Sequence, residues 1–578
     1  MSEILDFIVI GSGTKILLHE PASNDRKFHH QSLSGLAFAR FQLDIHPKTR
    51  LTILEADDCL GGVWSSSRSY EEFWSQSGRR MTGFSDAPLT VPSDAPMYWD
   101  TFEAKYVTRY LEEYVESHDY EMKSLRSRIM FDHRVERVEK LDEKWSVSVK
   151  KSDGTQRTFR SLKLVVATGH TSIPNMPTLT NEKEFTGQVI HHKDFGQASR
   201  SILIEEDCKL ITVLGGGKSA ADMVYQSVKK GKTVNWVIRK SGEGPALLFP
   251  APGHGRYKNS IESSATRYKA CFSPSSFMPW LPSLPHQTSY GINYMKKRVE
   301  DVDDHCRDIV GYETREDALP SFKDLDFTTS AFWCTGPLGL AQHDDFWDTI
   351  AKHVTVHRKD ITSMTPQGIV LDDGTEIPTD ALLCGTGWKS SYPFLSSDLS
   401  KTLGLPQQYQ VEDETWKALL NTADQLVLTK FPQLAHPPLN LRPTTPTTTS
   451  KLYKGIAPLS DQSIVFLGHI DISNSFRAAE AQAIWSTAYF DNKVTMPPLE
   501  QAQQDVAYMI AFSKRRYPTH GQKGDCFFFE LVWYTDALMD EVGLRSHRRK
   551  GWWGDWVEPC LAEDFKDVVG EYRRKFGI

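Results

Sequence analysis

Two glycine-rich turns, each directly after a short apolar segment, constrain the fold of this chain more than any other feature of its sequence. The apolar segments cover residues 6–10 and 210–214, and the turns cover residues 11–13 and 215–217. Apolar runs of this length that stop at glycine are typical of buried parallel strands entering a tight turn. The repeat predicts an α/β fold with two Rossmann-like dinucleotide-binding domains.

The second turn has the spacing of a phosphate-binding turn. Gly215 and Gly217 allow backbone N–H groups to approach a pyrophosphate, and the N-terminus of the following helix stabilises its negative charge. Ser219 follows, and Ala220 can replace a third glycine because that position needs only close packing between helix and strand. Arg239 lies at the end of the next predicted strand, where an arginine suits the 2′-phosphate of NADP. We therefore predict NADPH at this turn; the alternative is a glycine turn without a ligand.

The first turn is interrupted. Gly11-Ser12-Gly13 follows its strand, but residues 14–32 intervene before Gly35 supplies the end of the expected fingerprint. Glu55 has the spacing from Gly35 of an acid that binds a ribose. These residues predict a second dinucleotide site whose turn has been split. Residues 14–32 are either a translated intron or a genuine surface loop, and both explanations stay open.

Composition excludes several classes of protein. A net charge of −7 and a pI near 6.3 give no basic surface for nucleic acid. The eight cysteines include no Cys-x-x-Cys pair, so neither a zinc site nor a redox dithiol is indicated. The N-terminus does not resemble a signal peptide, and no apolar run has the length of a membrane helix. We expect a cytoplasmic protein without a metal, nucleic-acid or membrane partner.

The C-terminal part carries two features that suggest no chemistry. We interpret the basic run from Arg545 to Lys550 as a solvated helix end. Trp552, Trp553 and Trp556 lie close together in the sequence and are expected to serve packing rather than binding.

Five short motifs occur in a fixed order along the chain. They are Gly61-Gly62-Val63-Trp64, Ser85-Asp86, Ala167-Thr168-Gly169, Phe185-x-Gly187-x-x-x-His191-x-x-x-Phe195 and Gly385-Thr386-Gly387. In this order they resemble the flavin-containing monooxygenases, a family related to the Baeyer–Villiger monooxygenases. The resemblance covers roughly residues 6 to 490.

The resemblance implies a discontinuous FAD-binding domain that an NADPH-binding domain interrupts. The FAD domain is expected in residues 1–177 and 390–490, and the NADPH domain in residues 178–389. Within the latter, residues 244–345 are rich in proline and aromatic residues and are expected to form an irregular or helical excursion that walls a pocket. Residues 491–578 are predicted to be a mainly helical extension and are the second candidate for a pocket wall.

The resemblance also assigns roles to residues. Gln76 stands where the N-oxygenating members have an asparagine, and Arg68 is similar to an arginine of the Baeyer–Villiger branch, so these two are the candidate catalytic residues. Loop hydrogen bonding is the alternative for both. His191 is expected to position a cofactor rather than to act as an acid or base. The other cofactor-binding positions that the motifs imply are Gly62, Trp64, Gly169, Phe185, Gly187 and Gly387.

The chemistry that the resemblance implies is the activation of oxygen. In the family, NADPH reduces FAD, the reduced flavin reacts with O₂ to form a C4a-hydroperoxide, and a small hydrophobic metabolite is oxygenated, at nitrogen or sulfur or by Baeyer–Villiger reaction. Two alternatives stay open. One is an NADPH oxidase-type flavoprotein, and the other is a non-catalytic relative in which residues 14–32 block the FAD-binding turn. A disulfide reductase is disfavoured, because it needs a redox cysteine pair.

Overall fold

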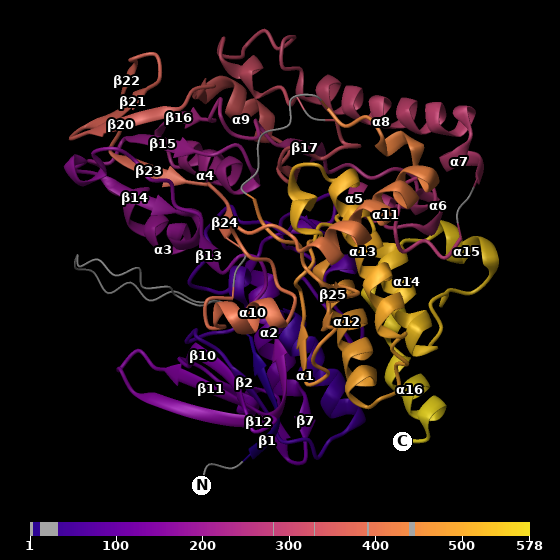
Figure 1. Ribbon diagram of the computed structural model, residues 1–578. Coiled ribbons are helices and arrows are strands. Elements are labelled where there is room, and N and C mark those ends of the chain that lie inside the picture. Colours follow the sequence, from indigo (N-terminus) through magenta and orange to yellow (C-terminus); the bar gives the residue numbers. More distant parts are fainter. Residues whose placement is uncertain (1–3, 12–32, 281–282, 329, 390–391, 439–445) are drawn as a thin grey trace.

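The computed structural model describes residues 4–11, 33–280, 283–328, 330–389, 392–438 and 446–578. A mixed sheet, an entirely parallel sheet and a layer of helices make up most of the molecule (Figure 1). The first sheet is built mostly from the N-terminal part of the chain. The second lies between residues 188 and 384, and the C-terminal helices pack beside both.

The first sheet has the order β10-β11-β12-β1-β2-β9, and β27 pairs with β12. The strand β12 pairs with three strands: with β1 along one edge, and with β11 and then β27 along the other. Since β1, β12 and β27 are parallel, their carboxyl ends share one edge of the sheet. The strands are β1 (Ile4–Ile10), β2 (Leu51–Leu54), β9 (Ile129–Met130), β10 (Arg134–Leu141), β11 (Lys144–Lys150), β12 (Gln156–Val166) and β27 (Ile464–Phe466).

Both faces of this sheet are buried, which explains the unbroken apolar run of β1. Phe7 and Val9 belong to one hydrophobic cluster, and Ile8 and Ile10 belong to another. The helices α1 (Leu33–Ile45) and α12 (Ser475–Phe490) pack against each other in the first cluster, and almost all their residues are buried.

The second sheet is entirely parallel, with the order β14-β23-β15-β16-β19. Its strands are β14 (Gln188–His191), β15 (Leu210–Leu214), β16 (Thr233–Val237), β19 (Val354–His357) and β23 (Ala381–Cys384). Its helices are α3 (His192–Ile202), α4 (Lys218–Lys229) and α9 (Phe346–His353). An antiparallel sheet is attached, formed by β20 (Ile361–Thr365), β21 (Gly368–Leu371) and β22 (Glu376–Pro378).

The chain crosses between the two sheets at a short ladder. β13 (Ile173–Pro174) follows the first sheet, β24 (Trp388–Lys389) follows the second, and the two strands pair antiparallel. Gly169 and Gly387 precede them with positive φ angles of 65° and 79°. The boundaries predicted at residues 177 and 389 fall beside this ladder.

Helices dominate the remaining parts. Residues 244–345 contain β17 (Leu247–Pro250), β18 (Leu338–Ala341), α5 (Ser260–Ser264), α6 (Arg267–Ala270), α7 (Ser283–Gln287) and α8 (Ser289–Val310). Beyond the ladder lie α10 (Ser397–Thr402), α11 (Glu414–Lys430), α13 (Leu499–Arg516), α14 (Leu531–Val542), α15 (Trp552–Val557) and α16 (Val568–Phe576). Of the helices in the described ranges, none has both the length and the apolar character required to cross a membrane.

Two expectations for the C-terminal part are wrong. Trp552 and Trp553 are largely exposed rather than packed, although Trp556 is half-buried. The basic run is not a simple solvated helix end, because Arg548 is almost buried and binds Glu571.

Candidate active site between the two sheets

The described ends of the first turn lie next to each other. A Cβ atom on Gly35 would stand 3.2 Å from Val9 Cγ1, 3.5 Å from Ala167 Cβ and 3.8 Å from Gly11 Cα. The first turn of α1 therefore packs on the carboxyl ends of β1 and β12, as the third glycine of a dinucleotide fingerprint requires. Ser12, Gly13 and residues 14–32 lie outside the described residues.

Glu55 stands at the same edge of the first sheet, directly after β2. It is fully buried, and its Oε1 accepts a hydrogen bond of 3.0 Å from the backbone N–H of Asp57. Its carbonyl oxygen accepts a hydrogen bond from the N–H of His133. The Asp57 N–H thus orients the carboxyl group, the His133 N–H fixes the backbone of Glu55, and contact of the carboxyl group with a ribose stays a prediction.

The loop after Glu55 carries the Gly-Gly-x-Trp motif to the second sheet. Gly61 and Gly62 have positive φ angles of 108° and 57°, which turn the chain before Trp64. Trp64 stacks on Phe73, with the ring centroids 5.3 Å apart. Both glycines have the left-handed conformation that larger residues rarely adopt.

Arg68 is buried where this loop meets α3. A Cβ atom on Gly196 of α3 would stand 2.2 Å from the Arg68 carbonyl oxygen, so only glycine allows the contact. Burial lowers the pKa of Arg68, and the carboxylates of Asp57 and Asp194 oppose that shift. Arg68 is thus an enclosed cation at the junction of the two sheets.

Gln76 has a different environment. It is exposed, and its Oε1 accepts a hydrogen bond of 3.2 Å from the N–H of Leu340 in β18. Close by, Gln342 Nε2 donates to the carbonyl oxygen of Trp74 at 2.7 Å. The segment around Gln76 therefore docks on the end of the 244–345 excursion, and a catalytic role for Gln76 stays a prediction.

The second turn is closed by small residues. Gly215 has a φ of 136°, and a Cβ atom there would stand 2.3 Å from the carbonyl oxygen of Gly385. A Cβ atom on Gly385 would in turn stand 2.6 Å from the Cβ of Ala220. Gly217 is the N-cap of α4, and Ser219 lies in its first turn. Gly215 and Gly385 are therefore required by close packing, and the binding of a pyrophosphate at this turn stays a prediction.

Arg239 lies exposed two residues after β16. The parallel register pairs Val237 with His357, which brings Arg358 to the same edge. The guanidinium of Arg358 stands 3.7 Å from where a Cβ on Gly244 would lie. Sequence reasoning missed Arg358, although its position directly after a buried strand is the signal that identified Arg239.

The Phe-x-Gly-x-x-x-His motif joins the second sheet to the ladder. Phe185 is buried, and a Cβ on Gly187 would stand 2.1 Å from the Asp380 carbonyl oxygen, so glycine is required there. His191 Nε2 donates to the carbonyl oxygen of Gly387 at 3.0 Å, and its Nδ1 accepts from the N–H of Lys193 at 3.1 Å.

This geometry also sets the protonation state of His191. Burial lowers the pKa of His191 to about 4, so the imidazole is neutral near pH 7. A neutral ring with Nδ1 accepting and Nε2 donating matches both of its hydrogen bonds. Its role in the structure is therefore to hold the second crossover.

The Ser85-Asp86 motif holds helices together. The N–H and Oγ of Ser85 both donate to Glu480 of α12 at 2.9 Å. Asp86 pairs with Arg40 of α1 at 3.3 Å and with His118 at 2.7 Å. This motif positions helices behind the first sheet.

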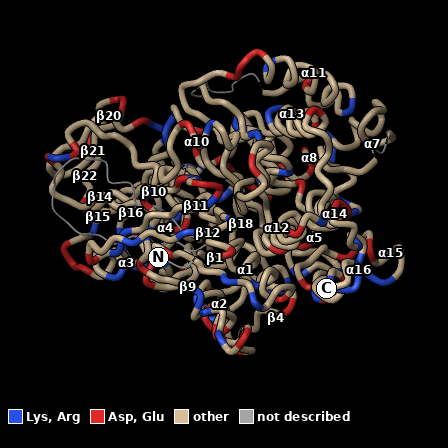
Figure 2. The backbone as a smooth tube through the Cα atoms, turned by 60° about the horizontal axis from the view of Figure 1, so that its bottom comes forward, with Lys and Arg blue, Asp and Glu red and all other residues tan. Residues whose placement is uncertain are grey.

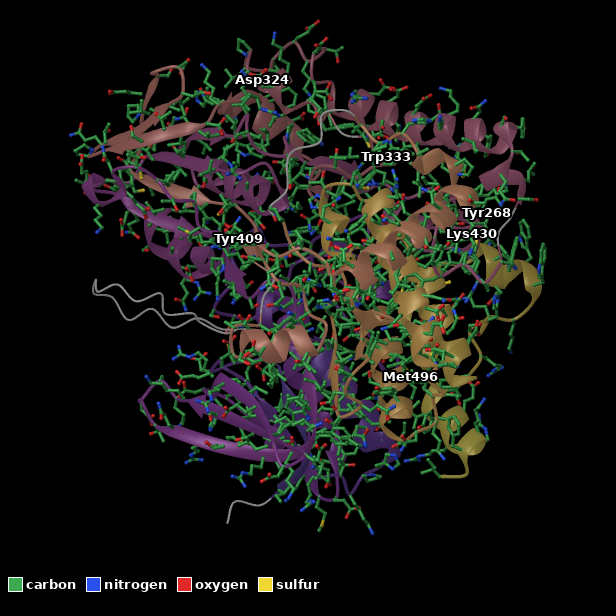
Figure 3. All side chains as sticks on the ribbon, in the orientation of Figure 1. Tyr268, Asp324, Trp333, Tyr409, Lys430 and Met496 are labelled. Atoms are coloured by element: carbon green, nitrogen blue, oxygen red, sulfur yellow. The ribbon has the colours of Figure 1, made fainter. Side chains whose placement is uncertain are left out.

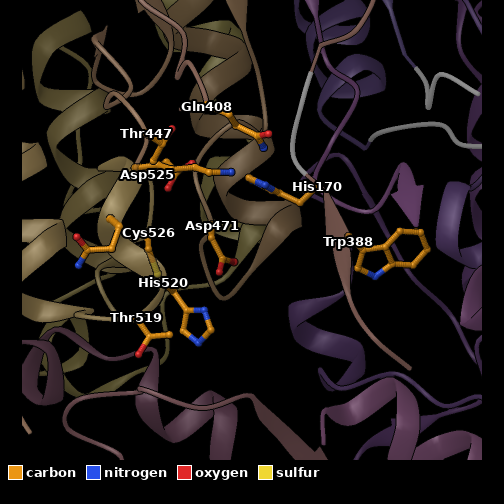
Figure 4. Close-up of a pocket in the computed structure, with 11 residues that line it drawn as sticks. His170, Trp388, Gln408, Thr447, Asp471, Thr519, His520, Asp525 and Cys526 are labelled. Carbon is orange, nitrogen blue, oxygen red and sulfur yellow. The ribbon is translucent and has the colours of Figure 1, made fainter. Parts of the chain in front are cut away.

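A cavity of about 390 Å³ opens at the two crossovers (Figure 4). His170 follows Gly169, Trp388 follows Gly387, and both line the cavity. In Figure 4, the side chain of His170 extends from the first crossover toward residues of later segments. The other lining residues are Gln408, Thr447, Asp471, Thr519, His520, Gln522, Lys523, Asp525 and Cys526.

The far wall of the cavity carries charge. Burial raises the pKa of Asp525, while the positive charges of Lys523 and His170 oppose the shift. The C-terminal region was expected to form a pocket wall, and residues 519–526 do line the cavity. None of the lining residues comes from residues 244–345, so the excursion does not wall this cavity as expected. The individual residues of the wall follow no motif and were not predicted.

Known proteins similar to this chain are flavoproteins. A model of the L-lysine 6-monooxygenase/L-ornithine 5-monooxygenase family matches residues 99–246. An FAD-dependent monooxygenase of Pyrenophora dematioidea is 29% identical over 548 residues, which cover 89% of this chain and 97% of the relative. Another, of Aspergillus nomiae, is 28% identical and covers 94% of this chain and 97% of its own length.

Solved structures share the fold of this chain. The crystal structure of cyclohexanone monooxygenase from Rhodococcus sp. Phi1 bound to NADP⁺ aligns with a TM-score of 0.58 and 14% identity. The alignment covers 93% of this chain and 97% of that one. This likeness concerns the fold alone; the similarity to the FAD-dependent monooxygenases over nearly the full length of the chain supports a flavin monooxygenase.

Proposed function

We propose that this protein binds FAD at the first sheet and NADPH at the second, and uses O₂ to oxygenate a small hydrophobic metabolite. One observation carries the proposal. The carboxyl ends of β12 and β23 lead to the same paired crossovers, and His170 and Trp388 from those crossovers line one cavity. Ligands of open α/β sheets bind outside the carboxyl ends of the strands, so two dinucleotides on these sheets would point toward this cavity.

The residues around the first turn fit FAD. Gly35 allows α1 to approach β1 and β12, and the N-terminus of α1 faces the edge at which a pyrophosphate binds. Glu55 is held at the end of β2, where an acid suits the ribose hydroxyl groups.

The residues around the second turn fit NADPH. Gly215 and Gly385 close the turn, and α4 begins beside it without a side-chain cap. Arg239 and Arg358 follow the neighbouring parallel strands β16 and β19, and guanidinium groups at this edge suit a 2′-phosphate better than a free ribose. This arrangement supports NADPH rather than NADH as the reductant.

Bound FAD and NADPH supply the oxygen-activating redox chemistry, and the protein supplies position and enclosure. Arg68 provides a buried positive charge at the junction of the sheets. His191, neutral near pH 7, holds the carbonyl oxygen of Gly387 and with it the second crossover. Gln76 accepts a hydrogen bond from Leu340, which holds β18 against the segment around Gln76. The substrate would enter the cavity between His170 and residues 519–526 and receive oxygen at nitrogen, at sulfur or at a carbonyl group.

We propose the cytoplasm as the place of action. All eight cysteines lie in described ranges and are free, which suits a reducing compartment.

The visible spectrum of the purified full-length protein tests the cofactor assignment. We expect a flavin band that anaerobic NADPH bleaches much faster than NADH does. NADPH oxidation under air, with product and H₂O₂ measured in parallel, then tests the reaction. Peroxide in full yield with every substrate offered would favour the oxidase-type alternative. A folded protein that takes up no added FAD would favour the non-catalytic alternative.

A further inference from the structure

Two segments far apart in the sequence share an unusual composition. Residues 267–298 contain five lysines and arginines and no acidic residue, although 74 of the 578 residues are acidic. Residues 545–553 contain four lysines and arginines and again no acidic residue. Both segments are rich in tryptophan or tyrosine. Both segments are cationic by composition in a chain whose net charge is −7, although Arg545 and Arg548 pair with Glu571 and Arg549 pairs with Asp564.

A buried ion-pair network joins the two segments in space. Arg267 of α6 is buried and donates to both carboxylate oxygens of Asp536 in α14, at 2.8 and 2.9 Å. The same guanidinium donates hydrogen bonds of 3.2 Å to two oxygens of Asp555 in α15, one in its carboxylate and one in its backbone carbonyl. Removing one partner of a buried pair leaves an uncompensated charge, so this junction is rigid. α6 and α15 are therefore fixed side by side.

Exposed apolar side chains gather on the outer side of this junction. Tyr290 is 74% exposed, Trp552 73% and Trp553 60%. Both views place α7 and α15 at the same side of the molecule, and Figure 3 labels Tyr268 there (Figures 1, 2 and 3). We call this surface the aromatic edge; its residues are Tyr268, Trp280, Leu284, Tyr290, Tyr294, Trp552 and Trp553.

Ring contacts form two groups within the aromatic edge. Tyr268 lies 5.4 Å from Phe272, and Phe272 lies 6.0 Å from Tyr294 of α8, centroid to centroid. Trp552 and Trp553 are 6.0 Å apart. Single exposed apolar residues are normal on a protein surface, whereas a connected group of them marks an interaction site.

Cationic side chains flank the aromatic edge. Lys296 and Arg298 are exposed on α8, and Lys550 is exposed directly before α15. Of the neighbouring acids, Asp301 pairs with Lys297 at 2.8 Å and Glu558 pairs with Arg256 at 2.9 Å, whereas Glu300 is exposed on α8. The surface is therefore amphipathic, with indole and phenol rings beside positive charges.

We propose that the aromatic edge binds the surface of a lipid bilayer that contains anionic lipids. Tryptophan and tyrosine favour the headgroup region, because their rings are apolar and carry one polar group. Lysine and arginine beside them are attracted to the negative charge of anionic headgroups. Binding of this kind needs no membrane-spanning helix and differs from the sequence-based expectation of no membrane partner.

Vesicle sedimentation tests the proposal on the full-length protein. We expect binding to phosphatidylcholine vesicles that contain phosphatidylserine, weaker binding to pure phosphatidylcholine, and a blue shift of tryptophan fluorescence on binding. Salt should weaken the binding, because it screens exposed charges. The double variant Trp552→Ser/Trp553→Ser should bind at least about tenfold more weakly. Trp99→Ser, a change of an exposed tryptophan elsewhere, should bind like the parent protein.

A second variant separates charge from aromatic insertion. Lys296→Glu/Arg298→Glu/Lys550→Glu keeps every tryptophan and should abolish the preference for phosphatidylserine. Circular dichroism and the melting temperature check that each variant is folded. The proposal is overturned if the parent protein binds neither type of vesicle, or if both variants bind like the parent. It is also overturned if the protein does not bind vesicles and Trp552→Ser/Trp553→Ser converts a dimer into a monomer. The aromatic edge would then be a contact between two copies of the chain.

Discussion

The two glycine turns reach a similar local geometry by different routes. In the second, Gly215 to Ala220 are continuous in the chain, and Ala220 packs on Gly385 at the end of β23. In the first, Gly35 packs on Val9 and Ala167 although residues 14–32 separate it from the strand. The contact between helix and strand is therefore kept while the continuity of the turn is lost. Helix packing alone can preserve the position at which a phosphate would bind.

The turns also differ in the tightness of this contact. A Cβ on Gly385 would stand 2.6 Å from the Ala220 Cβ and 2.7 Å from its backbone nitrogen, whereas a Cβ on Gly35 would meet its nearest atom at 3.2 Å. An alanine at position 385 would therefore force the atoms of Ala220 to move, whereas an alanine at position 35 would need only a slight shift of its neighbour. The second turn thus tolerates less change than the first.

Gly385→Ala should have the largest effect on this comparison. The added methyl group pushes α4 away from β23, and we expect a loss of about 3 kcal/mol in the free energy of unfolding. NADPH should reduce the flavin more slowly in the protein that remains folded. Thermal unfolding and stopped-flow reduction measure the two effects; an unchanged melting temperature would contradict the tight contact.

Arg239→Ala should come next, because it removes a charge-assisted contact without disturbing the core. We expect the KM for NADPH to rise about tenfold, with the KM for NADH nearly unchanged. Arg358→Ala should act in the same direction. The matched control is Lys359→Ala, whose side chain pairs with Asp373 instead. Equal losses with both cofactors would argue against recognition of a 2′-phosphate.

Deletion of residues 14–32 should act in the opposite direction. Gly11 and Gly35 are already adjacent, so a shorter connection has less closure entropy to lose. We expect a gain of about 1 kcal/mol in stability and equal or higher flavin content. Flavin absorbance per protein and the melting temperature provide the readouts. A deletion variant that folds but binds less flavin would show that the segment takes part in the site.

Gly35→Ala should have the smallest effect on stability. The strain against Val9 is mild, and alanine favours the helix by up to about 1 kcal/mol, so the two contributions should nearly cancel. Flavin affinity should still fall, because α1 must shift at the edge where the pyrophosphate binds. Titration of the apoprotein with FAD tests this; a large drop in melting temperature would remove the contrast with Gly385→Ala.

The strands that carry the site could be predicted from the sequence, and the C-terminal region could be expected to wall a pocket, but the individual residues of that wall could not be predicted. In strands such as residues 210–214, both faces of the strand are buried, and the continuous apolar sequence indicates this directly. The Gly385–Ala220 contact joins a strand end to a helix distant in the sequence, so no local pattern reveals it. Residues 519–526 line the cavity only because α13 and α14 turn there.

The exposure of Trp552 and Trp553 also could not be predicted. Their spacing is compatible with a packed or an exposed face of α15, and the direction of that face depends on the contacts of Arg267 in a remote segment. The density of aromatic residues indicates how much apolar surface exists, but not whether another element covers it.

The ladder between β13 and β24 has a mechanical consequence. Two chain crossings connect the sheets, and backbone hydrogen bonds fasten them to each other at Ile173–Lys389 and Pro174–Trp388. A force that separates the sheets therefore loads both crossings together rather than one after the other. His170 and Trp388 lie beside the ladder, so the pairing of the two crossings also fixes the distance between these two parts of the cavity wall.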